Sequence, residues 1–463
     1  MHNILDLTAR QVVSAFTTKE LSPVDYMQAL IARVEASEPW VQALWLFRPE
    51  MALEMARASE ARYLRGAPLG PLDGMPVTVK ELIATKGDPV PTGTAALPLD
   101  PAREDAPTVA RLREDGAIIF AKTTCPDFGM LSSGLSSFHE LSRNPWDLSQ
   151  NPGGSSAGAA AAGAAGYGPL HVGTDIGGSV RLPAGWTGLF GLKPSFGRVP
   201  IDPYYTGRVA GPMTPTVDDA ALIMHSITRP DWRDATALAY ERLDWDVGPT
   251  NVQGLKIGLM MDAGCGLPVD PDVREAVAKA AMTFEENGAT IIPIGPVLTR
   301  PMLDGLDRAW RARFWGLMQK LPAQAQDRIL PYIRQWAASA AMLSPIEVAD
   351  GYEQIYAMKR ATNGALQRID FILSPVNPKR SFAADWASPT NDPTRPFEHI
   401  AFTVPWNMGE QPAASIHCGM SSTGIPIGLQ IVGHRHDDLG VMRLSRAYEE
   451  WRGPITNWPR HER

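Results

Sequence analysis

The chain is poor in cysteine and has no long apolar run. Its three cysteines, Cys125, Cys265 and Cys418, are widely spaced, which excludes a disulfide framework and indicates a reducing compartment. Neither CxxC nor HExxH occurs, so we expect no metal site and no cofactor. No run of about eighteen apolar residues is present, and the first residues lack the basic and apolar regions of a signal peptide. We therefore expect a cytoplasmic protein without a membrane partner.

Clusters of basic residues are also missing. The formal net charge is −7, and no stripe of Lys and Arg could follow a phosphate backbone. This argues against nucleic acid as a direct partner. The hydrophobic content of 44% is ordinary for a globular protein and is sufficient for a sizeable core.

Two glycine-serine segments stand out in the middle of the chain. They read PGGSSAG at residues 152–158 and GTDIGGSVR at residues 173–181. Glycine permits positive φ and close approach of backbone N–H groups, so Gly-Gly-Ser can supply both a nucleophile and the amides that hold an oxyanion. The alanine-rich run 157–165 favours a buried helix over a flexible linker, with Ser155 and Ser156 at its N-terminus.

A catalytic serine needs a base, and no histidine lies in either loop. The nearest one, His171, is interpreted as a packing residue. Lys80 ends the stretch PVTVK at residues 76–80, which predicts a short buried strand, and burial can make a lysine neutral enough to act as a base. Taken alone, Lys80 is more typical of a surface residue whose amine reaches solvent.

Together these segments resemble the amidase signature family of serine hydrolases. The similarity extends from about residue 5 to residue 448. The matching motifs are GMPVTVK (74–80), NPW (144–146), PGGSS (152–156), GTDIGGSVRLPA (173–184), GLKP (191–194), GPMT (211–214), the segment 402–412 and GIPIGLQ (424–430). Ala157 and Ala159 stand where the family commonly has glycine and serine, a difference that concerns helix packing and not the reaction.

The resemblance implies a Ser-cisSer-Lys triad. In this triad Ser179 is the nucleophile, Ser155 is the bridging serine on a cis peptide bond, and Lys80 is the general base. The other implied site residues are the oxyanion-hole amides of Ile176, Gly177, Gly178 and Ser179, the loop-holding residues Ser156, Asp175 and Arg181, and an apolar acyl pocket at Gly129, Met130 and Leu131. A plain structural ion pair of Asp175 with Arg181, and ordinary core packing of Met130 and Leu131, are the alternatives.

The fold is expected to be α/β, a single amidase-signature domain over residues 1–463 with a central mixed β-sheet covered by helices on both faces. Within it we distinguish an N-terminal helical segment (1–65), a catalytic core (66–230) with the signature region 153–184, a helix-rich substrate-side segment (265–360) and a C-terminal part of the core (361–463). Its aromatic residues are expected mainly in the core.

Local patterns place the individual elements. Helices are expected over residues 8–36, with Ser22 as an N-cap, and over residues 49–65. Strands are expected over residues 77–80, 117–120, 171–173, 256–261, 371–373 and 427–432. Residues 197–211 are expected to form a loop over the site, and residues 381–396 a mobile segment that borders the pocket entrance.

The main functional interpretation is an amidase that hydrolyses the C–N bond of a small carboxamide to acid plus ammonia or amine through a Ser179 acyl-enzyme. A homodimer is compatible with this interpretation. The alternative is the glutamine-hydrolysing subunit of a tRNA-dependent amidotransferase. For that protein an acidic residue is expected just before Phe402, where this chain has Ile400 and Ala401.

Three other classes are disfavoured. An α/β-hydrolase would place Ser156 at a nucleophile elbow after a strand, but residues 144–152 contain two prolines and no strand pattern. A penicillin-binding enzyme requires SxxK, which does not occur. A scaffold protein with a decayed site is at odds with the retention of all three triad residue types.

Overall fold

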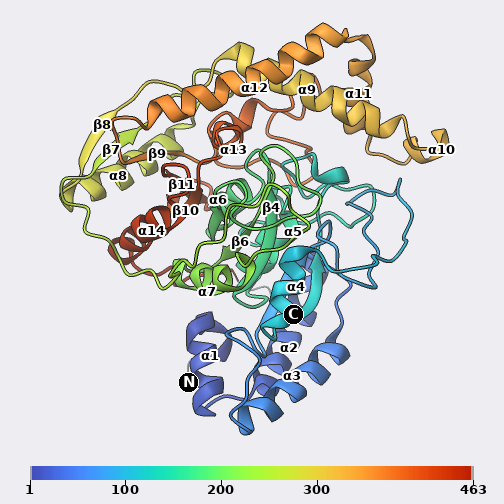
Figure 1. The fold of residues 1–463 in the computed structure, drawn as a ribbon, viewed down its shortest axis with the longest axis vertical. Coiled ribbons are helices and arrows are strands. Elements are labelled where there is room, and N and C mark those ends of the chain that lie inside the picture. Colours follow the sequence, from blue (N-terminus) through green and yellow to red (C-terminus); the bar gives the residue numbers. More distant parts are fainter. Residues whose placement is uncertain (1–2, 460–463) are drawn as a thin grey trace.

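The computed structural model describes residues 3–459. An eleven-stranded mixed sheet forms the centre of their fold (Figure 1). The strand order is β1-β3-β2-β4-β6-β5-β10-β11-β9-β7-β8. The bounds are β1 Leu44–Trp45, β2 Pro76–Lys80, β3 Ile118–Thr123, β4 Leu170–Asp175, β5 Phe190–Lys193, β6 Val209–Thr214, β7 Lys256–Leu259, β8 Thr290–Pro293, β9 Phe371–Pro375, β10 Ala413–Met420 and β11 Pro426–Val432.

Strand β2 lies between β3 and β4 and runs parallel to both. Strands β4, β6, β5, β10, β11 and β9 are antiparallel to their neighbours in that order, and β9, β7 and β8 are again parallel. All six strands expected from the sequence are present, whereas β1, β5, β6, β8 and β10 were not predicted. The sheet is therefore mixed, as expected.

The boundary of the loop expected over residues 197–211 is wrong. Strand β6 begins at Val209, which pairs with Asp175 at the end of β4. Gly211 and Pro212 lie inside β6, and these residue types are normally poor strand formers. Gly211 is required here because a Cβ on it would lie 2.0 Å from the carbonyl oxygen of Leu192.

The N-terminal helices follow the local signals in the sequence. They are α1 (Ala9–Thr18), α2 (Pro23–Val41) and α3 (Pro49–Leu64). Ser22 is the N-cap of α2, and its hydroxyl accepts hydrogen bonds from the N–H groups of Val24 and Asp25. These helices lie together at the blue end of the ribbon in Figure 1.

Helix α5 (Ala157–Ala165) is the buried helix that the alanine-rich run predicts. All nine residues are buried, and Ser156 is the N-cap. Close packing depends on small residues, because a Cβ on Gly158 would lie 2.2 Å from the carbonyl oxygen of Ala43. The helix packs on β4 and on the short helix α6 (Arg181–Thr187). The two glycine-serine segments thus lead into two adjacent helices.

Helices cover both faces of the sheet. Helices α5 and α6 pack on one face, and α7 (Val217–Ile227), α8 (Pro271–Glu286) and α14 (Asp438–Arg452) pack on the other. Neighbouring strand residues accordingly belong to different hydrophobic clusters: Leu373 and Ile431 to one, Ile372 and Val432 to the other.

The segment expected to be rich in helices contains α9 (Arg300–Met318), α10 (Ala323–Gln326), α11 (Pro331–Ala338) and α12 (Pro345–Ala365). Helices α9 and α12 lie side by side along one edge of the molecule (Figure 1). The remaining α-helices are α4 (Pro107–Glu114) and α13 (Val404–Met408). Within residues 3–459, no helix combines the length and the hydropathy needed to cross a membrane.

Candidate active site

Lys80 lies at the end of β2 and is fully buried. Its Nζ donates hydrogen bonds to Ser155 Oγ at 2.7 Å and to Thr174 Oγ1 at 3.1 Å. Burial is the main cause that lowers the pKa of Lys80, to about 8, so about a tenth of the amine is neutral at pH 7. The alternative of a lysine that reaches solvent is therefore wrong.

Ser155 follows a cis peptide bond between Gly154 and Ser155. The backbone at Gly154 is tightly enclosed, because a Cβ there would lie 2.4 Å from the amide nitrogen of Ser133. Ser155 is buried, and a Cβ on Gly129 would lie 3.5 Å from its Oγ. Gly129, one of the expected acyl-pocket residues, thus lies directly beside Ser155.

Ser179 lies in the loop between β4 and α6 and is nearly buried. Its carbonyl oxygen accepts a hydrogen bond from the N–H of Ser156 at 3.2 Å. The hydroxyl of Ser156 in turn accepts from Thr174 N and donates to Thr174 O. Ser156 therefore ties the two glycine-serine loops together, in agreement with the loop-holding position expected for it.

Asp175 shapes the loop that carries Ser179. Its carboxylate accepts hydrogen bonds from the amides of Gly178 at 2.7 Å, Val180 at 3.1 Å and Arg181 at 3.4 Å. The N–H of Gly178 is thereby engaged, so Gly178 does not offer the oxyanion-hole donor that we expected of it. The N–H groups of Ile176, Gly177 and Ser179 donate no hydrogen bond to any acceptor within residues 3–459. These three amides are therefore free for a ligand.

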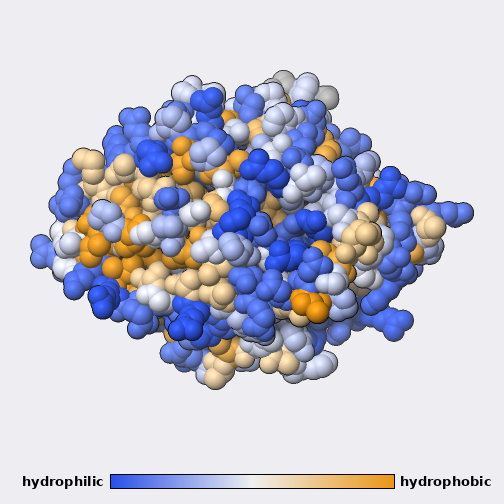
Figure 2. Space-filling model, turned by 90° about the horizontal axis from the view of Figure 1, so that it is seen from above, coloured by the Kyte–Doolittle hydropathy of each residue, from blue (hydrophilic) through white to orange (hydrophobic). Residues whose placement is uncertain are grey.

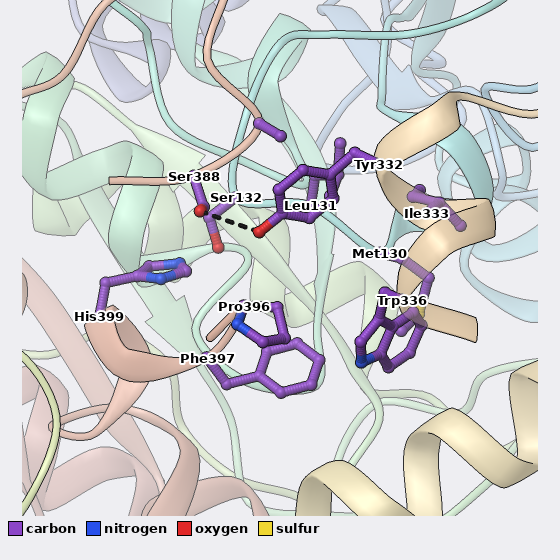
Figure 3. A pocket seen from close by; sticks show the side chains of 11 residues that line it. Met130, Leu131, Ser132, Tyr332, Ile333, Trp336, Ser388, Pro396, Phe397 and His399 are labelled. Carbon is purple, nitrogen blue, oxygen red and sulfur yellow. Dashed lines mark hydrogen bonds between the residues drawn. The ribbon is translucent and has the colours of Figure 1, made fainter. Parts of the chain in front are cut away.

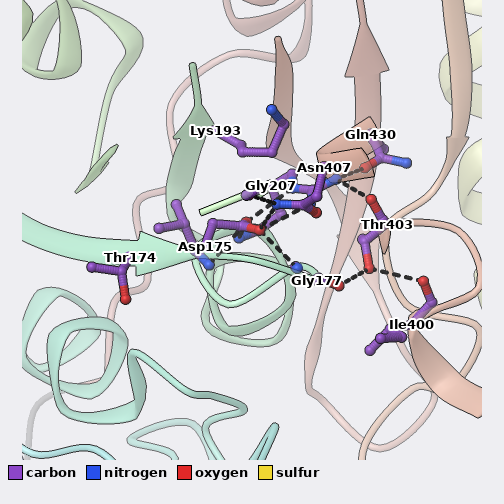
Figure 4. Close-up of polar contacts among 12 residues, drawn as sticks. Thr174, Asp175, Gly177, Lys193, Gly207, Ile400, Thr403, Asn407 and Gln430 are labelled. Atoms are coloured by element: carbon purple, nitrogen blue, oxygen red, sulfur yellow. Dashed lines mark hydrogen bonds and ion pairs between the residues drawn. The ribbon is translucent and has the colours of Figure 1, made fainter. Parts of the chain in front are cut away.

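Asp175 and Arg181 form a fully buried ion pair at 3.0 Å, and Figure 4 shows Asp175 beside Asn407, which also bonds to it. Arg181 also donates to Thr403 O, Gln430 Oε1 and Asn407 Oδ1, and Asn407 Nδ2 donates to Asp175 Oδ1 at 2.8 Å. Burial alone would raise the pKa of Asp175, but Arg181 and Asn407 hold it well below its usual range. The pair is thus satisfied on both sides.

Replacing Asp175 by Ala should lower the free energy of unfolding by about 3 to 5 kcal/mol, because Arg181 is left charged and unpaired in the interior. Urea unfolding measures the change. Since the folded pKa of Asp175 is depressed, the stabilisation is present above the pKa of the unfolded carboxyl and is lost as pH falls through the folded value. Asp246→Ala, which breaks an exposed ion pair with Arg10, is the control and should cost less than about 1 kcal/mol. Equal losses in the two variants would contradict this account.

Met130 and Leu131 line a cavity of about 20 Å³ (Figure 3). Its other walls come from Ser132, from α11, from Phe397 and His399, and from the segment expected at the pocket entrance, of which Ala387, Ser388 and Pro396 line the cavity. Aromatic rings connect it to Gly177: the rings of Trp336 and Phe397 are 5.6 Å apart, those of Phe397 and Trp310 are 5.2 Å apart, and a Cβ on Gly177 would lie 3.2 Å from Trp310. Trp336 and Phe397 are core residues, whereas Trp310 is only partly buried.

Two arginines flank the ring of Tyr205, which lies in the segment between β5 and β6. The guanidinium carbons of Arg313 and Arg208 lie 4.0 Å and 5.1 Å from the ring centroid. Arg208 directly precedes Val209, the strand partner of Asp175, and Arg313 lies one turn after Trp310 on α9. Arg208 also donates a hydrogen bond to Pro203 O, and neither arginine forms an ion pair with a carboxylate of residues 3–459.

Sequence reasoning missed several residues of this site. It gave no role to Thr174, Thr403, Asn407 or Gln430, although all four lie in segments that carried the resemblance. Their partners are more than 200 residues away in three cases, as for Asn407 with Asp175. His171 is a buried structural residue as expected, with Nδ1 bonded to Thr78 Oγ1 and Nε2 to Gly168 O.

Comparisons with known proteins agree with this geometry. A protein-family model described as Amidase matches residues 25–442. The chain is 32% identical to a subunit of the glutamyl-tRNA(Gln) amidotransferase of Chloroflexus aggregans, over 98% of this chain and 97% of that protein. It is 34% identical to the corresponding subunit from Myxococcus xanthus, over 96% and 97%. The crystal structure of a bacterial aryl acylamidase of the amidase signature enzymes superimposes with a TM-score of 0.88 and 28% identity, over 96% of both chains.

Proposed function

The chain belongs to the amidase signature family of amide-cleaving enzymes, and we propose that Lys80, Ser155 and Ser179 form its catalytic triad. The observation that supports this proposal most is the 2.7 Å hydrogen bond from the fully buried amine of Lys80 to Ser155 Oγ. A neutral Lys80 accepts a proton from Ser155 while Ser155 accepts one from Ser179, and Ser179 Oγ attacks the carbonyl carbon.

The open amides of Ile176, Gly177 and Ser179 hold the oxyanion that forms in this attack. Collapse of the tetrahedral intermediate breaks the C–N bond, and the proton on Lys80 returns through Ser155 to the leaving amine. Water then attacks the acyl group on Ser179 and releases the acid, with the same lysine as the base. Each proton transfer in this sequence is carried by a side chain of the triad.

Two acyl donors are candidates: glutamine, and a small carboxamide with an uncharged acyl group. Different observations favour each of them. The amidotransferase relatives support glutamine as donor, within a complex of several subunits, more than they support a stand-alone amidase. Arg208 and Arg313 could receive the carboxylate of glutamine. The side chains next to Gly177 favour an uncharged acyl group. A Cβ on Gly177 would lie 3.2 Å from the side chains of Ile400 and Trp310, so its surroundings are apolar. Ile400 stands where an acidic residue for the glutamine amine was expected.

Release of ammonia from a panel of amides decides between them. The purified chain is assayed with aliphatic and aromatic amides and with glutamine, and with Ser179→Ala as the control. Hydrolysis of simple amides by the chain alone, absent from the control, would establish an independent amidase. Hydrolysis of glutamine only, or only after the other amidotransferase subunits are added, would establish the amidotransferase function. Equal release by the control would refute the proposed mechanism.

A further inference from the structure

His399 is a buried histidine whose ring has no partner. It lies in the 3-10 helix η4 (Glu398–Ile400), is 1% exposed, and neither Nδ1 nor Nε2 forms a hydrogen bond with any described residue. His171 shows the ordinary arrangement, with both ring nitrogens bonded. Because buried polar groups in folded proteins are nearly always paired, an unpaired imidazole indicates that its partner is a ligand.

The imidazole of His399 points into the cavity lined by Met130 and Leu131. Figure 3 shows the ring directed towards Ser132 and Ser388. Ser388 Oγ is already bonded to Tyr332 Oη at 3.2 Å and to Thr390 Oγ1 at 2.9 Å and accepts from Asn391 N at 3.2 Å. Ser132 also lines the cavity, and none of the hydrogen bonds within residues 3–459 involves its hydroxyl. The cavity therefore offers two free polar groups within a mainly apolar lining.

Three connections link this cavity to the catalytic residues. Met130 and Leu131 directly follow Gly129. A Cβ added at Gly129 would lie 3.5 Å from Ser155 Oγ. His399 directly precedes Ile400, whose side chain would lie 3.2 Å from a Cβ added at Gly177. Phe397 lines the cavity and contacts Trp310, the other neighbour of Gly177. Segments that contact Ser155 and Gly177 thus both contribute residues to the lining of this cavity.

We propose that His399 and Ser132 bind a hydroxyl group at the far end of the acyl part of the substrate. This inference rests on the proposed function, since it takes Ser179 as the point of attack. A neutral imidazole offers one donor and one acceptor, and a hydroxyl group complements both. A volume of about 20 Å³ admits one small group at the end of a chain or ring and excludes a second ring.

Charged groups fit this cavity poorly. Burial lowers the pKa of His399 to about 3, so the ring is neutral at pH 7 and does not pair with a carboxylate. The neighbouring Glu398 is held by Arg300 at 2.7 Å and 2.8 Å and by Arg395, so it is not available for an ammonium group. The substrate class is therefore a carboxamide with an apolar body and a terminal hydroxyl.

The test compares matched amides that differ in one hydroxyl. Straight-chain amides of increasing length, and phenylalkanoic amides, are each assayed with and without a terminal or para hydroxyl. We expect the hydroxylated member to have a kcat/KM about 10- to 100-fold higher at one length or ring position. In His399→Leu that ratio should fall to about 1, and in Ser132→Ala it should fall by a smaller factor.

A stability measurement separates binding from a structural role. His399→Leu replaces an unpaired buried polar group and should keep or raise the melting temperature. His171→Leu is the matched control: it breaks two hydrogen bonds of a buried ring and should lower it. A hydroxyl preference that survives in His399→Leu, or the lack of any preference in an active wild-type enzyme, would overturn this inference alone. Lack of hydrolysis of every amide, including glutamine in the presence of the other amidotransferase subunits, would instead refute the proposed function, and this inference with it.

Discussion

Ser179→Ala should reduce kcat/KM for the best amide substrate by about 10⁴-fold or more, by analogy with other serine triads. The variant keeps the open amides of Ile176 and Gly177, so substrate binding persists while the covalent step is lost. Steady-state ammonia release measures the change. Retention of more than a tenth of the wild-type activity would show that another group is the nucleophile.

Ser156→Ala is the matched control for this variant. Ser156 is adjacent to Ser155, is fully buried, and bonds only to the backbone of Thr174 through its hydroxyl. Its loss should loosen the loops and reduce the rate far less than the loss of Ser179. If the two variants lost activity equally, the distinction between nucleophile and loop-holding serine would not hold.

Lys80→Ala should be similarly severe, and the pH dependence of the wild type should identify the reason. Because burial lowers the pKa of Lys80 to about 8 and only the neutral amine acts as a base, kcat/KM should rise with pH and level off above about pH 8. Below that value it should fall about tenfold per pH unit. Measurement of kcat/KM from pH 5 to 9 tests this, and a flat profile would exclude a lysine base.

Lys122 provides the control for the lysine variant. It is also buried, burial lowers its pKa to about 8, and its amine donates to Ile83 O and Thr85 Oγ1, not to a serine. Lys122→Met should change stability but leave the pH at which activity rises unchanged. A shift of the profile in this variant and not in others would move the role of base from Lys80 to Lys122.

Local sequence signals predicted much of the fold for identifiable reasons. The Ser22-Pro23 pair places the start of α2, and the run of small residues 157–165 coincides with the buried helix α5. The strands missed were those whose residues are poor strand formers or too few to show a pattern, such as Gly211 and Pro212 in β6 and the two residues of β1. Their pairing comes from distant neighbours, which local propensity does not report.

The site was predictable only where its residues are contiguous in motifs. Lys80, Ser155 and Ser179 lie in such motifs, and their roles came from the resemblance. The engagement of Gly178 by Asp175 depends on the turn that the loop adopts, and the sequence does not specify which amides of a glycine-rich loop stay free. His399 has no motif at all; its importance follows from the lack of a partner for its ring in the folded chain.

The most direct test of the central claim is to label the active chain with a fluorophosphonate and to locate the adduct by peptide mass spectrometry. We predict one adduct, on Ser179, whose formation slows as pH falls below about 8 and does not occur in Lys80→Ala. An adduct on Ser155 or Ser156, or full labelling of the Lys80 variant, would contradict the proposed triad.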